Sequence, residues 1–192
     1  MTATETHNAI VAASDDLFYE LGFERTSFAQ IAEVVGISRG NFYYHFKTKD
    51  EILDAVIEKR LEDRRALMDD WARKGETPEQ RIAAFIRILL VNQSKIRAYG
   101  CPLGTLLTEL SKVDHPGEQG ARRLFDLFRV WLRRQFELMG RTDDADELSL
   151  HLLARSQGVA TVANAYPNEP FLENEVQQML AWLSAVSASR TA

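Results

Sequence analysis

Apolar residues recur at spacings of three and four along almost the whole chain, and no stretch alternates with a period of two. This periodicity predicts helices and no strands. The first apolar stripe runs from Ile10 to Leu21, and Gly22 follows it as a natural stop. We therefore expect a first helix over about residues 6–21.

Two short helices joined by a glycine are predicted next. Thr26 or Ser27 is placed to cap the first of them, and Gly36 closes it. Ser38 is placed to cap the second, which continues to Tyr44. Small and apolar residues in the first helix allow the two to pack, so the pattern is that of a helix-turn-helix.

The remaining helices are separated by glycine, proline and capping residues. The first two are expected over about residues 49–71 and, behind a Thr77 cap, over residues 78–99. A short helix starts near Pro102, and after a loop at residues 115–117 another helix ends at Gly140. The last two run from an Asp143 or Asp144 cap to Tyr166, and from after Pro170 through Val186. The chain is thus predicted to be all-α, with about nine helices.

Composition fits a folded globular protein. Hydrophobic residues make up 45% and charged residues 27% of the 192 positions, both close to ordinary averages. No apolar run reaches the roughly 18 residues of a membrane span, and residues 1–10 do not resemble a signal peptide. We expect a cytoplasmic protein with no membrane contact, and the single cysteine, Cys101, fits a reducing compartment.

The net charge of −5 means that any nucleic-acid contact must come from a local basic patch. Such a patch lies between Gly36 and Lys49, where three cations and no acid occur. The preceding 35 residues hold six acids and Arg25 as their one cation. The second helix of the predicted helix-turn-helix and the residues just after it therefore carry the positive charge that double-stranded DNA attracts.

Within this patch the side chains divide into two predicted roles. Hydroxyl, imidazole and ammonium donors are expected to hold phosphates. Arg39 and Asn41 are expected to reach guanine and adenine edges, with Phe42 or Tyr44 touching a thymine methyl. The predicted DNA-contacting residues are Thr26, Ser27, Ser38, Arg39, Gly40, Asn41, Phe42, Tyr43, Tyr44, His45, Lys47 and Lys49.

The same segment resembles the N-terminal signature of the TetR family of regulators. The matching positions are Ser27, Ile31, Ala32, Gly36, Ser38, Gly40, Tyr43, Phe46, Lys49 and Ile52. The resemblance implies a helix-turn-helix DNA-binding domain over residues 6–50 and an effector-binding and dimerisation domain over residues 51–192. It further implies a homodimer through the last two long helices, and a repressor that a small molecule releases from operator DNA.

Two sets of apolar residues leave alternatives open. The stripes of the last two helices favour a dimer interface, with core burial as the alternative: Leu148, Leu152, Val159, Val162, Val176, Leu180 and Leu183. A second set is expected either to line an effector pocket or to fill the core: Phe85, Leu89, Tyr99, Cys101, Leu106, Phe125, Phe128 and Trp131.

Cys101 sits at a forced helix break before Pro102, where a helix start favours a thiolate. The Gly-Cys-Pro-Leu-Gly stretch resembles a TetR branch with electrophile-responsive members. A reactive thiol is one interpretation, and a small buried side chain is the other.

Enzymatic signatures are missing, since the sequence has no glycine-rich phosphate loop, nucleophile elbow or His-Glu-x-x-His. The four histidines show no metal spacing, and no cofactor is expected. A ligand-binding protein that uses this scaffold without DNA is the remaining alternative to a regulator.

Overall fold

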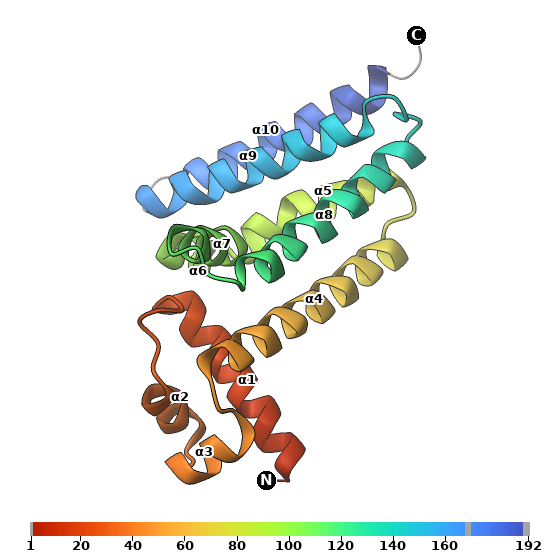
Figure 1. The fold of residues 1–192 in the computed structure, drawn as a ribbon. Helices are drawn as coiled ribbons and strands as arrows, with labels where there is room; N and C mark the ends of the chain where they lie inside the picture. Colours follow the sequence, from red (N-terminus) through yellow and green to blue (C-terminus); the bar gives the residue numbers. More distant parts are fainter. Residues whose placement is uncertain (1, 168–169, 190–192) are drawn as a thin grey trace. The chain divides into compact units, whose positions relative to one another are not determined.

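The computed structural model describes residues 2–167 and 170–189, and every regular element in those ranges is a helix (Figure 1). The predicted all-α class is therefore confirmed. The helices are α1 (Ala3–Glu20), α2 (Phe28–Val35), α3 (Arg39–His45), α4 (Lys49–Lys74), α5 (Pro78–Val91), α6 (Gln93–Tyr99), α7 (Pro102–Lys112), α8 (Glu118–Leu138), α9 (Ala145–Ala165) and α10 (Phe171–Ala188).

Side-chain caps fix several helix starts where the sequence predicts them. The hydroxyls of Ser27, Ser38 and Thr77 each accept a hydrogen bond from the backbone N–H three residues on. Gly36 closes α2 with a positive φ of 73°, a conformation that favours glycine. The first helix begins earlier than predicted, because Thr2 caps it at Ala3.

Two local predictions need correction. The helix predicted over residues 78–99 is divided at Asn92, whose side-chain amide donates to the Ile88 carbonyl as α5 ends. Asp144 occupies the N-cap position of α9 but makes no capping hydrogen bond. Its carboxylate pairs with Arg141 instead.

The helices gather into two compact units, and the chain passes from one to the other inside α4, between Cys101 and Pro102, and inside α8. The first unit comprises residues 1–63 and 102–124, and the second comprises residues 64–101 and 125–192. In the first unit α1 packs against both α2 and α7, and α2 packs against α3. The predicted division of function between residues 6–50 and 51–192 stays a prediction, because packing alone does not assign function.

The core of the second unit is built largely by α5, α9 and α10, and α9 lies alongside α10 (Figure 1). Much of the apolar stripe predicted as a dimer interface is buried within one chain, as the alternative of core burial predicts. The buried members are Leu152, Val159, Val176 and Leu183. Val162 stays 37% exposed, and Leu150, twelve residues earlier on α9, is 44% exposed, so parts of this helix retain an apolar surface.

Candidate nucleic-acid interface

Helices α2 and α3 form a helix-turn-helix whose inner side is apolar. Ile31 and Ala32 of α2 are buried, and the Ile37 N–H donates to the Ala32 carbonyl at 3.0 Å across the turn. Phe42 of α3 is 1% exposed, and its ring centroid lies 5.0 Å from that of Phe28. This packing fixes which side of α3 faces outward.

The outward side of α3 carries polar and aromatic groups. Arg39, Gly40 and Asn41 are exposed, as are Tyr43 at 45% and Tyr44 at 72%. Beside them is a hollow of about 350 Å³ between α2 and α3, whose lining includes Ser27, Arg39 and Tyr43. The surface therefore presents a guanidinium, a carboxamide and two phenols within one short helix.

Two predicted DNA contacts are corrected by the burial of their side chains. Phe42 is part of the core and does not offer its ring to a thymine methyl. Thr26 is 2% exposed, and its hydroxyl donates to the carbonyls of Gly22 at 2.8 Å and Leu17 at 3.3 Å. Both residues hold the helices in place, whereas the neighbouring Ser27 is exposed and caps α2.

The cations at the end of this segment differ in their surroundings. Lys47 is exposed, and its ammonium donates to the Tyr43 carbonyl at the end of α3. The half-buried Lys49 ammonium donates to the carbonyls of Glu24 at 3.1 Å and Thr26 at 3.4 Å. It also lies 4.4 Å from the centroid of the Phe23 ring, a cation–π distance. Lys49 is thus engaged by the connection between α1 and α2.

The same connection is held on its other side by Glu109 of α7. The Glu109 carboxylate accepts one hydrogen bond from the Phe23 N–H and another from the Glu24 N–H, each at 2.9 Å. The role of Glu109 is not predictable from the sequence, because no local pattern links this residue to a turn 86 residues away. Glu109 and Lys49 together fix the peptide groups that precede α2.

Arg60 is a second residue that sequence analysis missed. Its side chain is 3% exposed, and its Nε lies 2.6 Å from an Asp15 carboxylate oxygen. Its Nη1 donates to the Pro102 carbonyl at 2.8 Å. One buried guanidinium therefore joins α1, α4 and the first residue of α7.

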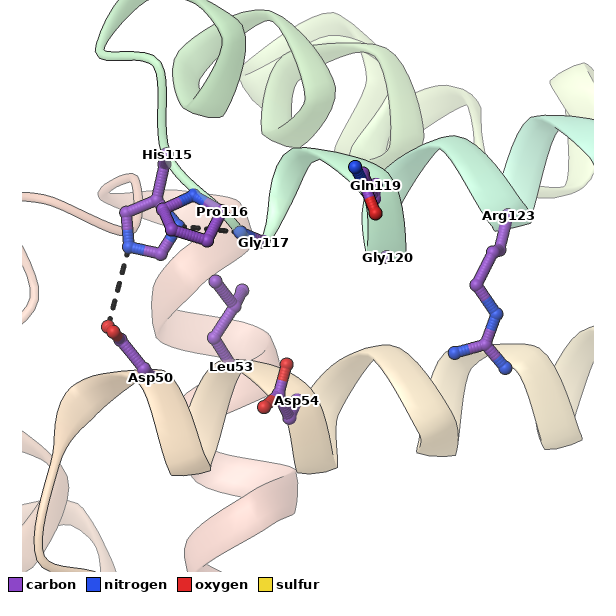
Figure 2. Close-up of a pocket in the computed structure, with 9 residues that line it drawn as sticks. All are labelled: Asp50, Leu53, Asp54, His115, Pro116, Gly117, Gln119, Gly120 and Arg123. Carbon is purple, nitrogen blue, oxygen red and sulfur yellow. Dashed lines mark hydrogen bonds and ion pairs between the residues drawn. The ribbon is translucent and has the colours of Figure 1, made fainter.

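A groove of about 450 Å³ lies where the α7–α8 loop meets the first turns of α4 (Figure 2). The Nε2 atom of His115 is 3.4 Å from an Asp50 carboxylate oxygen, and its Nδ1 accepts from the Gly117 N–H at 3.0 Å. The His115 ring also contacts the edge of Phe23, at 5.1 Å between centroids. The loop is thereby fastened to the same turn that Glu109 and Lys49 hold.

His45 at the end of α3 is half-buried, and its ring contacts those of Tyr44, at 5.1 Å, and His7. In the ranges that the structure describes, no three His, Cys, Asp or Glu side chains are grouped so as to hold a metal ion. Within those ranges, too, no helix combines the length and apolar character needed to cross a bilayer.

The predicted effector residues are distributed over both units. Leu106 is buried in the first unit, and Leu89 is buried in the second. Phe85, Phe128 and Trp131 form one aromatic cluster with Trp71, with centroid distances of 5.5 Å for Phe85–Phe128 and 5.5 Å for Trp71–Trp131. Sequence analysis did not include Trp71 in this group.

The remaining three effector candidates differ in exposure. Tyr99 is 38% exposed at the end of α6, Phe125 is half-buried, and Cys101 is a half-buried cysteine before α7.

Comparison with known proteins agrees with this arrangement. The family described as bacterial regulatory proteins, tetR family, matches residues 10–56. An HTH-type transcriptional regulator in the lacX 3' region of Lactococcus lactis is 28% identical over 122 residues, which are 62% of this chain and 62% of that protein. The regulator TtgR of Pseudomonas putida is 36% identical over 78 residues, which are 41% of this chain and 35% of TtgR.

The likeness to solved structures extends over nearly the whole chain. A crystal structure of a TetR transcriptional regulator from Legionella pneumophila covers 91% of this chain and 94% of its own, with a TM-score of 0.80 and 22% identity. At this identity the likeness concerns the fold. The chain spans less than two thirds of the length of either sequence relative named above.

Proposed function

Because this chain belongs to the TetR family of bacterial regulatory proteins, we propose that it is a DNA-binding transcriptional regulator that acts on operator DNA. The observation that carries the proposal is the exposed side of α3, where Arg39, Asn41 and Tyr43 project from a helix fixed by the buried Phe42. An α-helix of this kind fits the major groove of B-DNA. No enzymatic activity is proposed, in agreement with the family.

The residues of α3 take two roles in this proposal. Arg39 reads guanine with its forked donors, and Asn41 reads adenine with its carboxamide. Ser38, Tyr43 and Lys47 hold phosphates and fix the register of the helix without reading sequence. Support comes from their exposure and from the lack of acids between Gly36 and Lys49.

The test is fluorescence anisotropy on the DNA upstream of the protein's own gene, with a shuffled duplex as competitor. Arg39→Ala and Asn41→Ala are expected to relax base preference, each by about 1–3 kcal/mol at one position. Arg65→Ala and Asn174→Ala are matched controls, since both residues are exposed and far from α3 in the sequence. Equal affinity of the wild-type protein for both duplexes would favour a ligand-binding protein that does not use DNA.

The finer part of the proposal is a repressor released by a small molecule. An effector that distinguishes the DNA-bound from the free arrangement changes operator affinity, usually by about 5- to 150-fold. The aromatic cluster of Trp71, Phe85, Phe128 and Trp131 supports a binding place for such a molecule. Titration of the protein–operator complex with candidate effectors tests this part by itself.

We also propose a homodimer through α9 and α10, whose two-fold symmetry would be mirrored in a near-palindromic operator. The exposed Leu150 and Val162 on α9 supply apolar surface for it. Sedimentation equilibrium of the wild-type protein and of a Leu150→Glu, Val162→Glu double variant measures the association. A monomeric wild-type protein would contradict the dimer.

A further inference from the structure

Two buried side-chain oxygens in the described part of the second unit lack a hydrogen-bond partner, and one of them belongs to Gln135. Gln135 of α8 is 5% exposed, and among the described residues its Oε1 atom has no hydrogen-bond partner. A buried carbonyl oxygen without a donor carries a free-energy penalty that an apolar side chain of similar size avoids. The oxygen is therefore suited to accept a hydrogen bond from a bound molecule.

Gln135 lies on the same face of α8 as the aromatic cluster. It follows Trp131 by four residues and Phe128 by seven, so the three side chains share one helical stripe. Phe128 contacts Phe85 of α5, and Trp131 contacts Trp71 of α4. A flat ring beside these four aromatic side chains gains stacked or edge contacts, and Gln135 lies one helical turn beyond Trp131 along α8.

The other buried polar groups of the second unit limit the kind of ligand that can bind there. In its described part, the remaining buried polar residues are Ser149 and Ser156. Their hydroxyls donate to the Asp146 and Leu153 carbonyls of their own helix, each at 2.7 Å. No charged residue is buried in that part, so a charged ligand placed there has no buried counter-charge.

One other buried oxygen without a partner differs from Gln135. It is Oε2 of Glu173, whose Oε1 already accepts from Arg97 at 2.7 Å. The Glu173 side chain is 43% exposed, so it is not enclosed in the core. Gln135 is the better anchor because its whole side chain is enclosed.

We infer that Gln135 anchors a ligand site beside the Trp71, Phe85, Phe128 and Trp131 cluster. The site takes an uncharged aromatic molecule with one hydrogen-bond donor, such as a phenol. The donor O–H binds Gln135 Oε1, and the ring packs against the aromatic side chains. The molecule bound there belongs to the chemical class of the proposed effector. Only the consequence of its binding, release of the protein from DNA, rests on the proposed function.

The test compares para-alkylphenols with their methyl ethers by isothermal titration calorimetry in the absence of DNA. Ethyl, propyl and butyl members cover a range of sizes, and each ether keeps the ring but lacks the donor. The best phenol is expected to bind the wild-type protein about tenfold more tightly than its ether. Equal affinities, or no binding by any phenol up to its solubility limit, would overturn the inference.

Substitutions at Gln135 test whether its side-chain oxygen causes the preference for the phenol over its methyl ether. In Gln135→Leu and Gln135→Met the phenol and its ether are expected to bind equally, because the acceptor is gone. Gln178→Leu is the matched control, since Gln178 is exposed on α10, and it should retain the tenfold preference. A preference that persists in both Gln135 variants would place the donor elsewhere and overturn the assignment.

The wild-type comparison needs no variant, so a variant that fails to fold does not remove the test. Loss of operator binding leaves the calorimetry unaffected, and the two proposals can therefore fail separately.

Discussion

The Glu109 carboxylate accepts a hydrogen bond of 2.9 Å from the Phe23 N–H, across 86 residues of chain, and its other oxygen accepts one from the next N–H. The turn before α2 is therefore built partly by a side chain of α7. Two backbone donors depend on one carboxylate, and an unpaired donor that is shielded from water destabilises the folded state.

Replacement of Glu109 by alanine is expected to lower the free energy of unfolding of the first unit by about 1–3 kcal/mol. Amide hydrogen exchange at Phe23 and Glu24 should accelerate, because both N–H groups lose their acceptor. Urea denaturation and exchange monitored by NMR measure the two effects. Glu62→Ala is the matched control, since Glu62 is exposed on α4; equal effects of the two substitutions would exclude the role given to Glu109.

Lys49 and Lys47 are expected to differ in how they affect DNA binding. The Lys49 ammonium is half-buried against the Phe23 ring, whereas Lys47 is exposed. Lys49→Met should therefore reduce stability and leave the salt dependence of operator affinity unchanged. Lys47→Met should lower the slope of log affinity against log salt by about one. Anisotropy titrations at several salt concentrations give both slopes. An equal drop for Lys49→Met would restore the prediction from sequence that Lys49 binds phosphate.

Arg60→Met is expected to be strongly destabilising, by about 3 kcal/mol, because it removes one partner of a buried ion pair. This loss lies at the lower end of the range that is usual for breaking a buried ion pair, because the Lys59 ammonium remains 3.6 Å from an Asp15 carboxylate oxygen. Adding Asp15→Asn should recover part of the loss, which a double-mutant cycle in urea detects. Arg122→Met, at an exposed pair on α8, is the control. Additive effects of the two substitutions would show that Arg60 and Asp15 do not interact.

The local features of this fold were predictable from the sequence, and the tertiary ones were not. The helix ends at Ser27, Ser38 and Gly36 were predictable, because a cap depends on groups within four residues of it along the chain. Glu109 and Arg60 hold elements that lie more than 40 residues away, and no spacing rule connects them.

The sequence also did not predict which side chains of a helix face the core. Phe42 and Tyr43 are adjacent aromatic residues whose rings both contact Phe28, yet Phe42 is 1% exposed and Tyr43 is 45% exposed. Tertiary packing, and not residue type, decides which of the two rings is buried. The apolar stripe with Leu152 and Val159 shows the same limit, because a stripe indicates burial without naming what covers it.

Stability should also depend on pH through Asp146, which links α9 to Arg129 of α8 by two hydrogen bonds, of 2.9 and 2.5 Å. The hydrogen bond from Arg129 lowers the pKa of Asp146 from its ordinary 3.8. A lowered folded-state pKa stabilises the protein above the unfolded-state value, and this contribution disappears as the pH falls through the folded-state value.

Between pH 5 and 3, the wild-type protein is therefore expected to lose more stability than Asp146→Asn, and the two curves should converge at the acidic end. Urea denaturation followed by tryptophan fluorescence measures both. Parallel curves over this range would mean that Asp146 has the same pKa in the folded and unfolded chains.

The first unit is assembled from two separate stretches of chain, residues 1–63 and 102–124. On the ribosome α3, the helix proposed to read DNA, therefore emerges well before the carboxylate of Glu109 and the carbonyl of Pro102 that complete the packing of this unit. Domains synthesised in this way complete their packing only when the last contributing segment leaves the exit tunnel. A nascent or truncated chain that stops before residue 102 is expected to carry α3 on an incomplete core, and so to be degraded by proteases more readily than the full chain.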